Sequence, residues 1–277
     1  MTLLAPGVSL APENNIPSCD LLVIVATSSE RDALKNVANK KGCDFRRIRK
    51  SGIGRYYDLG MIGDERAIAV KTSGMGPLSF RGSADLAMRC RQLTGATAIV
   101  QLGMAFGVDP DSQNYGDVLV SSGVIPYDNR DYVETDGTRG YDVDYSRAGF
   151  EPAGPIYERF NQESLQNHAS RKYSVFTGAI LSGSARIFSE TFRDELLASV
   201  PKGFDPIVGG EMEAVGLLGT SELPIWCVVK GISDFGDKKR HEVIEEKRAQ
   251  ACENATEFFY STLLNQQNGD IIFPVIN

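Results

Sequence analysis

Buried-strand patterns alternate with helix starts along this chain, and this alternation limits its fold more than any other feature. The first apolar run, Leu21 to Ala26 (LLVIVA), is long enough for a strand buried on both faces. The segment Thr27–Glu30 (TSSE) follows it, and these residue types cap helices. Because strands that alternate with helices form a sheet covered by helices, we expect an α/β fold. No Pro- or Ser-rich linker interrupts the pattern, which indicates a single domain.

The same patterns locate the remaining elements. Further strands are expected over residues 97–102, 117–121, 174–181 and 225–232, with a hairpin over 56–70. Helices are expected over residues 32–38, 78–93, 155–170, 192–198, 211–221 and 242–264. Residues 126–154 are rich in Asp, Tyr, Gly and Arg without periodicity, which indicates a long surface loop. We expect residues 1–19 to be a flexible N-terminal arm and residues 20–277 to be the folded domain.

Charge and composition exclude several classes of protein. The net charge of −7 and the pI of about 5.0 argue against a nucleic-acid binder, which usually presents a basic field. No apolar run approaches the roughly 20 residues that span a bilayer, and Met1 to Cys19 lacks a basic segment before an apolar core. We therefore expect neither a membrane partner nor a secretory signal. The five cysteines are widely spaced, which indicates free thiols in a cytoplasmic protein. The two histidines have no second ligand nearby, so we expect no zinc site.

Acidic residues follow several of the expected strands. Glu30 comes just after the first strand, Glu211 and Glu213 follow a Gly-Gly pair, and Asp234 follows the strand over 225–232. An acid at a helix N-terminus is favourable in any protein, by about 0.3–1 kcal/mol, so one of these alone indicates little. A parallel sheet, however, gathers the ends of its strands in one crevice. The set therefore predicts an active site at that edge of the sheet.

Two segments carry a resemblance to a known family. The stretches GGEMEAVGL (209–217) and VVKGISDFGD (228–237) resemble the purine nucleoside phosphorylase and nucleosidase superfamily, closest in pattern to its methylthioadenosine/S-adenosylhomocysteine nucleosidase branch. SGMGP (73–77), LGMAFG (102–107) and YGDVLVSSG (115–123) fall in the order that the family uses. The resemblance covers Leu21 to Leu264. It implies a central twisted mixed β-sheet flanked by helices, a catalytic domain over residues 20–277, cleavage of the N-glycosidic bond of a small purine substrate, no cofactor and a homo-oligomer.

The resemblance also implies roles for individual residues. Asp234 is the expected general acid, which protonates the departing purine and needs a raised pKa to hold its proton near neutral pH. Glu213 is expected to bind the ribose hydroxyls and to stabilise the positive charge of the sugar. Met212 either packs against the sugar or belongs to the core. The residues expected to contact substrate are Gly103, Met104, Ala105, Phe106, Arg186, Ile187, Glu211, Met212, Lys230 and Ser233.

The choice between hydrolysis and phosphorolysis depends on the other side of the sugar. Phosphorylases of the superfamily carry arginines at two positions that match Glu30 and Gln101 in this chain, and many carry a phosphate-binding serine where Met104 stands. A carboxylate repels phosphate and serves as a base for water, so this pattern favours a hydrolase with Glu30 as the base. Two alternatives stay open: a phosphorylase that binds phosphate elsewhere, and a nucleoside-binding module without turnover.

Cations replace expected residues at other positions. Arg186 stands where the nucleosidases place an aromatic residue that stacks on the base, so stacking falls to Arg186, Phe188 or Phe106. Lys230 replaces an arginine, and FRRIRK (45–50) with Arg55 forms a basic cluster. These cations predict a nucleotide substrate such as AMP or ATP and, since some relatives deplete nucleotides in bacterial immunity, a part in antiviral defence. The alternative for the cluster is an ordinary solvated strand edge.

Overall fold

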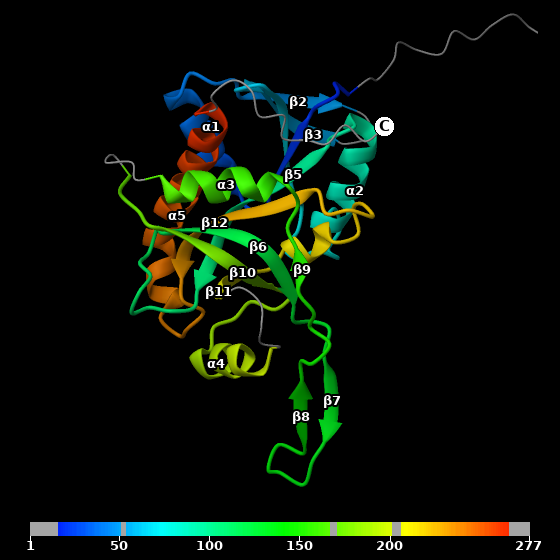
Figure 1. The fold of residues 1–277 in the computed structure, drawn as a ribbon, viewed down its shortest axis with the longest axis vertical. Coiled ribbons are helices and arrows are strands. Elements are labelled where there is room, and N and C mark those ends of the chain that lie inside the picture. The colour runs from blue at the N-terminus through cyan, green and yellow to red at the C-terminus, as the bar shows by residue number, and fades with distance from the viewer. Residues whose placement is uncertain (1–15, 51–53, 167–170, 201–205, 266–277) are drawn as a thin grey trace, which may run out of the picture.

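A mixed sheet of ten strands forms the centre of the part of the chain that the structure describes (Figure 1). The computed structural model describes residues 16–50, 54–166, 171–200 and 206–265. Nine strands follow the order β11-β10-β6-β12-β5-β1-β4-β3-β2, and β9 pairs with β6. Their bounds are β1 Leu21–Val25, β2 Arg46–Lys50, β3 Gly54–Ile62, β4 Glu65–Lys71, β5 Ala98–Gly107, β6 Val118–Pro126, β9 Glu151–Pro152, β10 Val175–Ser182, β11 Ile207–Glu211 and β12 Trp226–Asp234. The predicted α/β class with a mixed sheet is confirmed.

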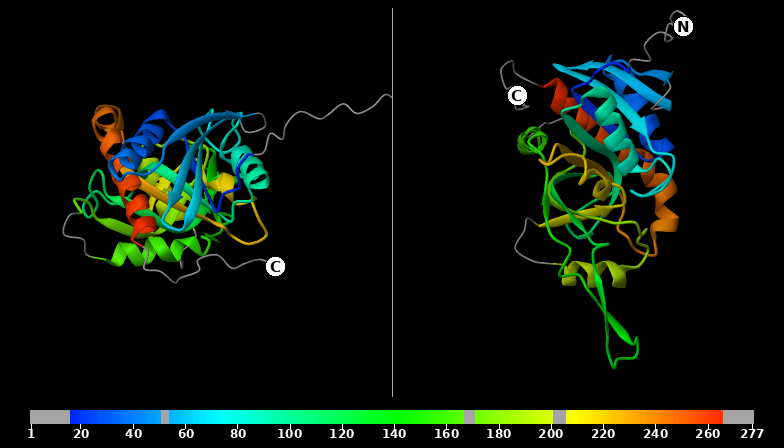
Figure 2. Two further views of the ribbon diagram at one scale, coloured as in Figure 1. Left: turned by 90° about the horizontal axis from the view of Figure 1, so that it is seen from above. Right: turned by 90° about the vertical axis from the view of Figure 1, so that its right-hand side faces the viewer.

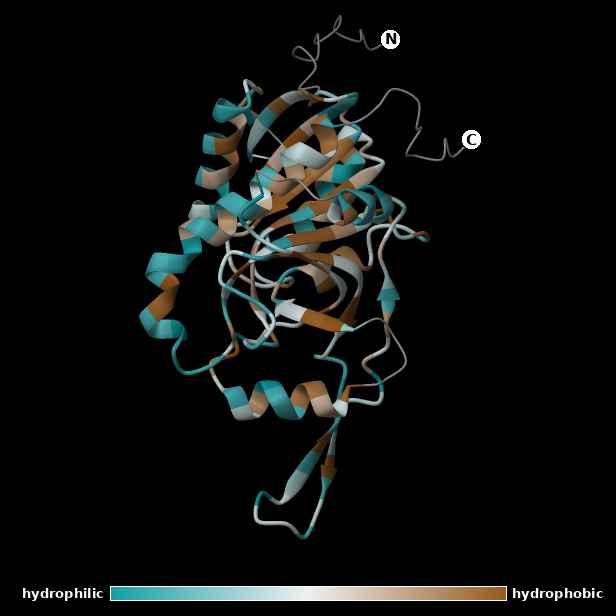
Figure 3. Ribbon diagram, turned by 60° about the vertical axis from the view of Figure 1, so that its left-hand side comes forward, coloured by the Kyte–Doolittle hydropathy of each residue, from teal (hydrophilic) through white to brown (hydrophobic). Residues whose placement is uncertain are grey.

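Helices cover both faces of the sheet (Figure 2). The helices are α1 Ser28–Lys40, α2 Ser83–Thr94, α3 Ile156–Leu165, α4 Glu190–Ser199 and α5 Arg240–Leu264, with a short 3₁₀ helix, η1, over Ala214–Leu217. One apolar cluster joins a sheet face to Leu86 of α2 and Leu217 of η1. A second cluster joins the opposite face to Leu34 of α1, Phe160 of α3 and Phe259 of α5. Burial of both faces explains the near-continuous apolar runs in the central strands, which Figure 3 shows in its hydrophobic colour.

The parallel strands at the centre bring their carboxyl ends to one edge. β12, β5, β1 and β4 are neighbours in that order and run parallel to one another. At the end of β1 the chain enters α1 through a capping box, in which the Thr27 hydroxyl accepts the Glu30 N–H. Glu30 is thereby held in the first turn of α1, next to the end of β5. The edge predicted from the strand–helix alternation therefore exists.

The Gly-Gly segment is a strand where a helix was expected to begin. The prediction of a helix over 211–221 is wrong at its start, because Glu211 ends β11 and only residues 214–217 are helical. β11 pairs with β10 and, through Gly209 and Gly210, with β5. A Cβ at Gly209 would lie 2.6 Å from the carbonyl oxygen of Phe106. Glycine is required for this close approach, which local propensity does not reveal.

Residues 126–154 differ from the loop that was expected. Two strands, β7 (Asp131–Glu134) and β8 (Tyr141–Asp144), form a hairpin that projects from the body of the molecule (Figures 1 and 3). Tyr132 and Tyr141 pack edge to face with ring centroids 5.5 Å apart. Because most of its residues are exposed, the hairpin lacks the alternation of buried and polar residues by which half-buried strands are predicted.

Two of the predicted segments lie partly outside the described residues. Of the arm expected over residues 1–19, residues 1–15 lie outside the described residues, and Ile16 and Cys19 are buried. The end of the helix expected over 155–170 also lies partly outside them, and α3 ends at Leu165.

The predictions about thiols can also be compared with the structure, and all five cysteines are free thiols. Within the described residues, no helix is long and apolar enough to cross a membrane, and no group of three metal-binding side chains occurs.

Candidate active site

The three acids expected to be catalytic line one small cavity at the carboxyl edge of the sheet. Glu30 comes from α1, Glu213 follows β11, and Asp234 ends β12. The other expected residues in its wall are Met104, Ala105, Phe106, Arg186, Ile187, Glu211, Met212 and Ser233. Five segments far apart in the sequence therefore bring together most of the residues that the motifs singled out.

Glu30 is fixed by the backbone around it. Its Oε2 accepts the N–H groups of Ala26 and Thr27, each at 2.7 Å, and its Oε1 accepts the N–H of Met104 at 3.0 Å. Only 2% of the residue is exposed. Gly103 does not line the cavity, but a Cβ on it would overlap Oε1 of Glu30, so the glycine makes room for the carboxylate. Since Oε1 accepts one backbone N–H, it retains capacity to accept a proton from water.

Asp234 has a raised pKa, as a general acid requires. The residue is 3% exposed, and burial raises the pKa of its carboxyl group. Arg240 opposes this shift with an ion pair between its Nε and Oδ2 of Asp234 at 3.0 Å. The N–H of Gly236 and the hydroxyl of Ser233 also donate to the carboxyl, at 3.0 and 2.9 Å. Burial outweighs these three contacts, and the net direction is upward.

Glu213 shares a buried charge cluster with Glu211 and Lys230. Burial raises the pKa of Glu213 to about 7, and Glu211 adds to the shift while Lys230 opposes it. Nζ of Lys230 lies 3.3 Å from Glu211 and 3.9 Å from Glu213. Glu211 also accepts the N–H groups of Glu213 and Ala214, both at 2.9 Å, which holds the turn between β11 and η1. The cluster therefore positions Glu213 at the cavity wall.

Lys230 does not make the phosphate contact that was expected of it, and Gln101 offers none either. Lys230 was expected to be able to contact a substrate phosphate, but its side chain is wholly buried and does not line the cavity. Its pKa is lowered by burial and raised by the three carboxylates of Glu211, Glu30 and Glu213, with a net rise that keeps it a cation. Gln101 is also wholly buried, in β5 between Ile24 and Val228. Neither residue presents a phosphate-binding group to the cavity.

Arg240 is a charged residue of the cavity wall that the sequence motifs missed, and Ala26, Thr27, Met75, Ala185 and Gly210 also line the cavity without having been expected there. Its guanidinium carbon lies 4.9 Å from the ring centroid of Phe188, and that of Arg186 lies 5.3 Å from the same centroid. His241 stacks on Phe188 as well, at 5.0 Å between centroids. Phe188 is thus occupied by these neighbours, which leaves Phe106 and Arg186 in the wall to stack on a base. The basic run KKRH (238–241) lies at the start of α5, where the helix dipole disfavours positive charge. This unfavourable placement was a signal in the sequence that could have pointed to Arg240.

The cavity is small for its expected ligand. Its volume is about 80 Å³, whereas ligand pockets usually offer roughly 300 Å³ or more. Arg240 is part of its wall and is paired with Asp234. A purine ligand therefore requires the wall to move outward.

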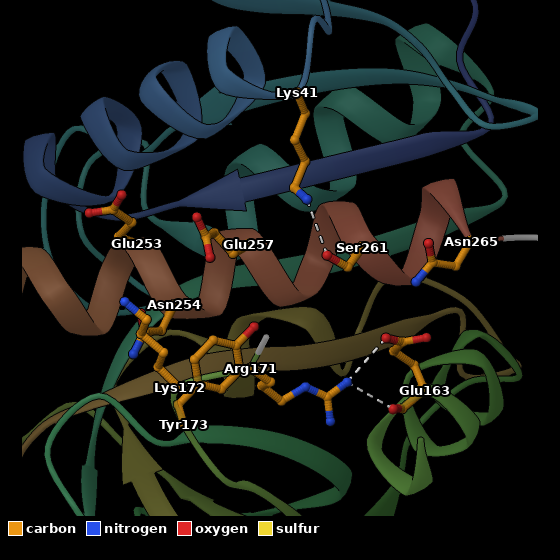
Figure 4. Close-up of a pocket in the computed structure, with 10 residues that line it drawn as sticks. All are labelled: Lys41, Glu163, Arg171, Lys172, Tyr173, Glu253, Asn254, Glu257, Ser261 and Asn265. Carbon is orange, nitrogen blue, oxygen red and sulfur yellow. Dashed lines mark hydrogen bonds and ion pairs between the residues drawn. The ribbon is translucent and has the colours of Figure 1, made fainter. Parts of the chain in front are cut away.

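A larger cavity of about 580 Å³ lies elsewhere, along α5 (Figure 4). Arg171 in its wall is directed toward Glu163 of α3, 3.1 Å away, and Lys41 toward Ser261 of α5, 3.2 Å away. It contains none of the acids at the strand ends. We therefore assign the chemistry to the smaller cavity, which holds all of them.

Known proteins resemble this chain in sequence and in fold. The 5′-methylthioadenosine/S-adenosylhomocysteine nucleosidase of Haemophilus ducreyi is 27% identical over 209 residues, which cover 72% of this chain and 80% of that protein. The Death domain-containing ATP nucleosidase of Amphimedon queenslandica is 26% identical over 178 residues, which cover 58% of this chain and 32% of that protein.

Solved structures show the same fold at lower identity. The 5′-methylthioadenosine/S-adenosylhomocysteine nucleosidase of Neisseria meningitidis, in complex with methylthio-immucillin-A, superposes with a TM-score of 0.67 at 19% identity over 89% of this chain and 99% of that one. Futalosine hydrolase of Helicobacter pylori has a TM-score of 0.66 at 18% identity over 88% and 96%. A family model described as the phosphorylase superfamily matches residues 20–264. The predicted family is thereby confirmed, and this chain belongs to the phosphorylase superfamily.

Proposed function

We propose that this chain hydrolyses the N-ribosidic bond of a purine nucleoside or nucleotide and releases the free base, with adenine favoured. The observation that carries the proposal is the pair of buried acids in one cavity: Asp234 with its raised pKa, and Glu30 held by backbone N–H groups. The names of the relatives support it, since they are nucleosidases or hydrolases.

Each acid has a separate role in the proposed reaction. Asp234 donates its proton to the purine ring as the bond to C1′ breaks and the base takes the bonding electrons. Glu213 accepts hydrogen bonds from the ribose hydroxyls and stabilises the positive charge that develops on the sugar. Glu30 takes a proton from water, whose oxygen forms the new bond to C1′. The products are the free base and the sugar with a hydroxyl at C1′.

The charges of the cavity wall favour water over phosphate as the attacking group. In the described part of the chain, the cations that line the cavity are Arg186 and Arg240, which share Phe188 as a neighbour, and Arg240 is paired with Asp234. The Glu30 end of the wall contributes a carboxylate and no cation. A phosphorylase needs positive charge where the anion attacks. Hydrolysis is therefore the better-supported reaction.

Analysis of the products tests this proposal directly. The protein is incubated with adenosine, methylthioadenosine, AMP and ATP, each with and without inorganic phosphate, and the products are separated by chromatography. We expect free adenine in the absence of phosphate. Adenine that forms only with phosphate would establish a phosphorylase instead. Release of no base from any of them would contradict the proposal and favour a binding module.

Removal of Arg240 is expected to shift the pH dependence of base release. Arg240 lowers the pKa of Asp234, so Arg240→Gln should raise that pKa further. Because Asp234 acts in its protonated form, the alkaline limb of kcat/KM should move to higher pH. Lys239→Gln is a matched control, since it removes the same charge from an exposed neighbour outside the cavity wall. An alkaline limb that does not move in Arg240→Gln would show that the ion pair does not tune the acid.

We also propose, from the family resemblance, an assembly of several copies and a part in antiviral defence, and, from the widely spaced cysteines, a cytoplasmic location.

A further inference from the structure

Positive side chains gather on the sheet beside Glu30. Arg49 of β2 lies opposite Arg55 of β3, and the pairing of Tyr56 with Val70 places Arg55 beside Lys71, the last residue of β4. Tyr56 and Ile48, the neighbours of Arg55 and Arg49 along their strands, pack in the core of the opposite face. Because side chains alternate along a strand, Arg49, Arg55 and Lys71 project from the same face. We call these three residues the cation row.

The cation row has no carboxylate partner within the described residues. Among the residues that the structure describes, no ion pair within 4.0 Å joins Arg49 or Arg55 to an acid, and Nζ of Lys71 donates to the carbonyl oxygen of Thr72 at 2.9 Å. Arginines nearby are neutralised: Arg46 pairs with Asp44 at 2.8 Å, and Arg66 with Asp58 at 2.6 Å. Like charges opposite one another in a sheet are destabilising. The cation row therefore leaves positive charge that the described residues do not neutralise, and an anion could neutralise it.

The cation row reaches the active-site edge of the sheet. Lys71 is paired in register with Val25, and Glu30 accepts the N–H groups of the two residues that follow Val25. Burial lowers the pKa of Lys71. The positive charges of Arg31 and Arg55 lower this pKa further, whereas the Glu30 carboxylate raises it. All three charged groups are therefore close enough to interact electrostatically with Lys71. The cation row therefore begins at Lys71, near Glu30, and crosses the sheet to β3 and β2 with one residue on each strand.

The strand order places the general acid, the base and the cation row one after another across the sheet. Asp234 ends β12, Glu30 and Met104 meet at the ends of β1 and β5, and the cation row follows on β4, β3 and β2. At about 4.8 Å between neighbouring strands, β12 and β4 are roughly 14 Å apart. In the proposed function the base lies at Asp234 and the ribose near Glu30 and Glu213. The C5′ substituent is the part of such a substrate that can extend beyond the ribose, along this line toward the cation row.

We propose that the cation row binds phosphate groups on the 5′ oxygen of the substrate, so that the substrate class is a purine nucleotide rather than a nucleoside. This inference rests on the proposed function for the placement of base and ribose. Guanidinium groups donate paired hydrogen bonds to phosphate oxygens, and the Lys71 ammonium supplies a point charge between Glu30 and the arginines. The cations lie beyond Glu30 and outside the cavity wall, where a 5′-phosphate extends and the reacting C1′ does not.

Kinetics with a series of substrates tests the inference. Adenine release is measured from adenosine, AMP, ADP and ATP, with the wild type, Arg49→Gln and Arg55→Gln. The control is Arg89→Gln, which removes an arginine from α2, the helix that packs on the opposite face. We expect kcat/KM in the wild type to rise with the number of phosphates, and each row variant to lose about tenfold for ATP, the effect of one charge-assisted hydrogen bond of about 1.4 kcal/mol. The loss in kcat/KM should be much smaller for adenosine than for ATP in both row variants, because adenosine carries no phosphate, and Arg89→Gln should leave kcat/KM unchanged for both substrates.

Binding calorimetry and the phosphate dependence of adenosine cleavage distinguish a nucleotide site from the alternatives. Calorimetric binding of ATP and of adenosine does not depend on turnover, so it tests the cation row even if the proposed hydrolysis fails. Preferential binding of ATP that weakens in both row variants and not in Arg89→Gln supports the inference. Equal kinetics and equal binding for adenosine and ATP would overturn it. Adenosine cleavage that requires inorganic phosphate and weakens in the row variants would also overturn it, because the cations would then bind a co-substrate.

Discussion

An Asp234→Asn variant should release base about 10²–10⁴ times more slowly than the wild type, because an amide has the same shape but no proton to donate. Asp234 is 3% exposed and ends β12 in the cavity wall, so the variant removes the acid without opening a void. The measurement is kcat for adenine release from the best substrate. Asp142→Asn, an exposed acid of β8 on the projecting hairpin, is the control and should keep full activity.

The pH profile distinguishes loss of the acid from general damage. Asp234 acts while protonated, and burial raises its pKa, so wild-type activity should fall as the pH rises through that pKa. Glu213 acts as a carboxylate with a pKa of about 7, so activity should also fall as the pH drops below that value. The residual activity of Asp234→Asn should lack the alkaline limb and keep the acid one. Near-wild-type turnover in this variant would show that another group protonates the base.

A Glu30→Gln variant should lose both activity and stability. An amide is not a base, so hydrolysis should fall by about 10²-fold or more. Glu30 accepts three backbone N–H groups through its two oxygens, whereas glutamine has a single oxygen, so at least one N–H will face the NH₂ group. The loss of a buried hydrogen bond to a charged group lowers the free energy of unfolding by roughly 1–3 kcal/mol. Turnover and thermal unfolding measure the two effects separately.

Glu158→Gln is the matched control for Glu30→Gln. Glu158 also lies in the first turn of a helix, α3, but it is exposed. If Glu30 were only a first-turn acid, both variants would lose a few tenths of a kcal/mol and keep their activity. Full hydrolysis by Glu30→Gln would refute its role as the base, and binding of the ligand by an inactive Glu30→Gln would support it.

Much of the fold and half of the site follow from local sequence patterns. The LLVIVA run and the TSSE cap predicted β1 and the start of α1, and the structure has both within a few residues. The acids were found because they stand directly after strands, where a parallel sheet gathers its ends. β11 was missed because its two glycines have low strand propensity, and they are there for contact with β5.

The sequence by itself determined the class of fold, the family and the acids, since each depends on residue types and on spacing along a short segment. The tertiary structure alone decided what surrounds those acids. It paired Arg240 with Asp234, placed Lys230 between Glu211 and Glu213 and outside the cavity wall, and aligned Arg49, Arg55 and Lys71 across β2, β3 and β4. Charge and burial depend on the distance in space between residues from different strands, and spacing along the chain does not specify that distance.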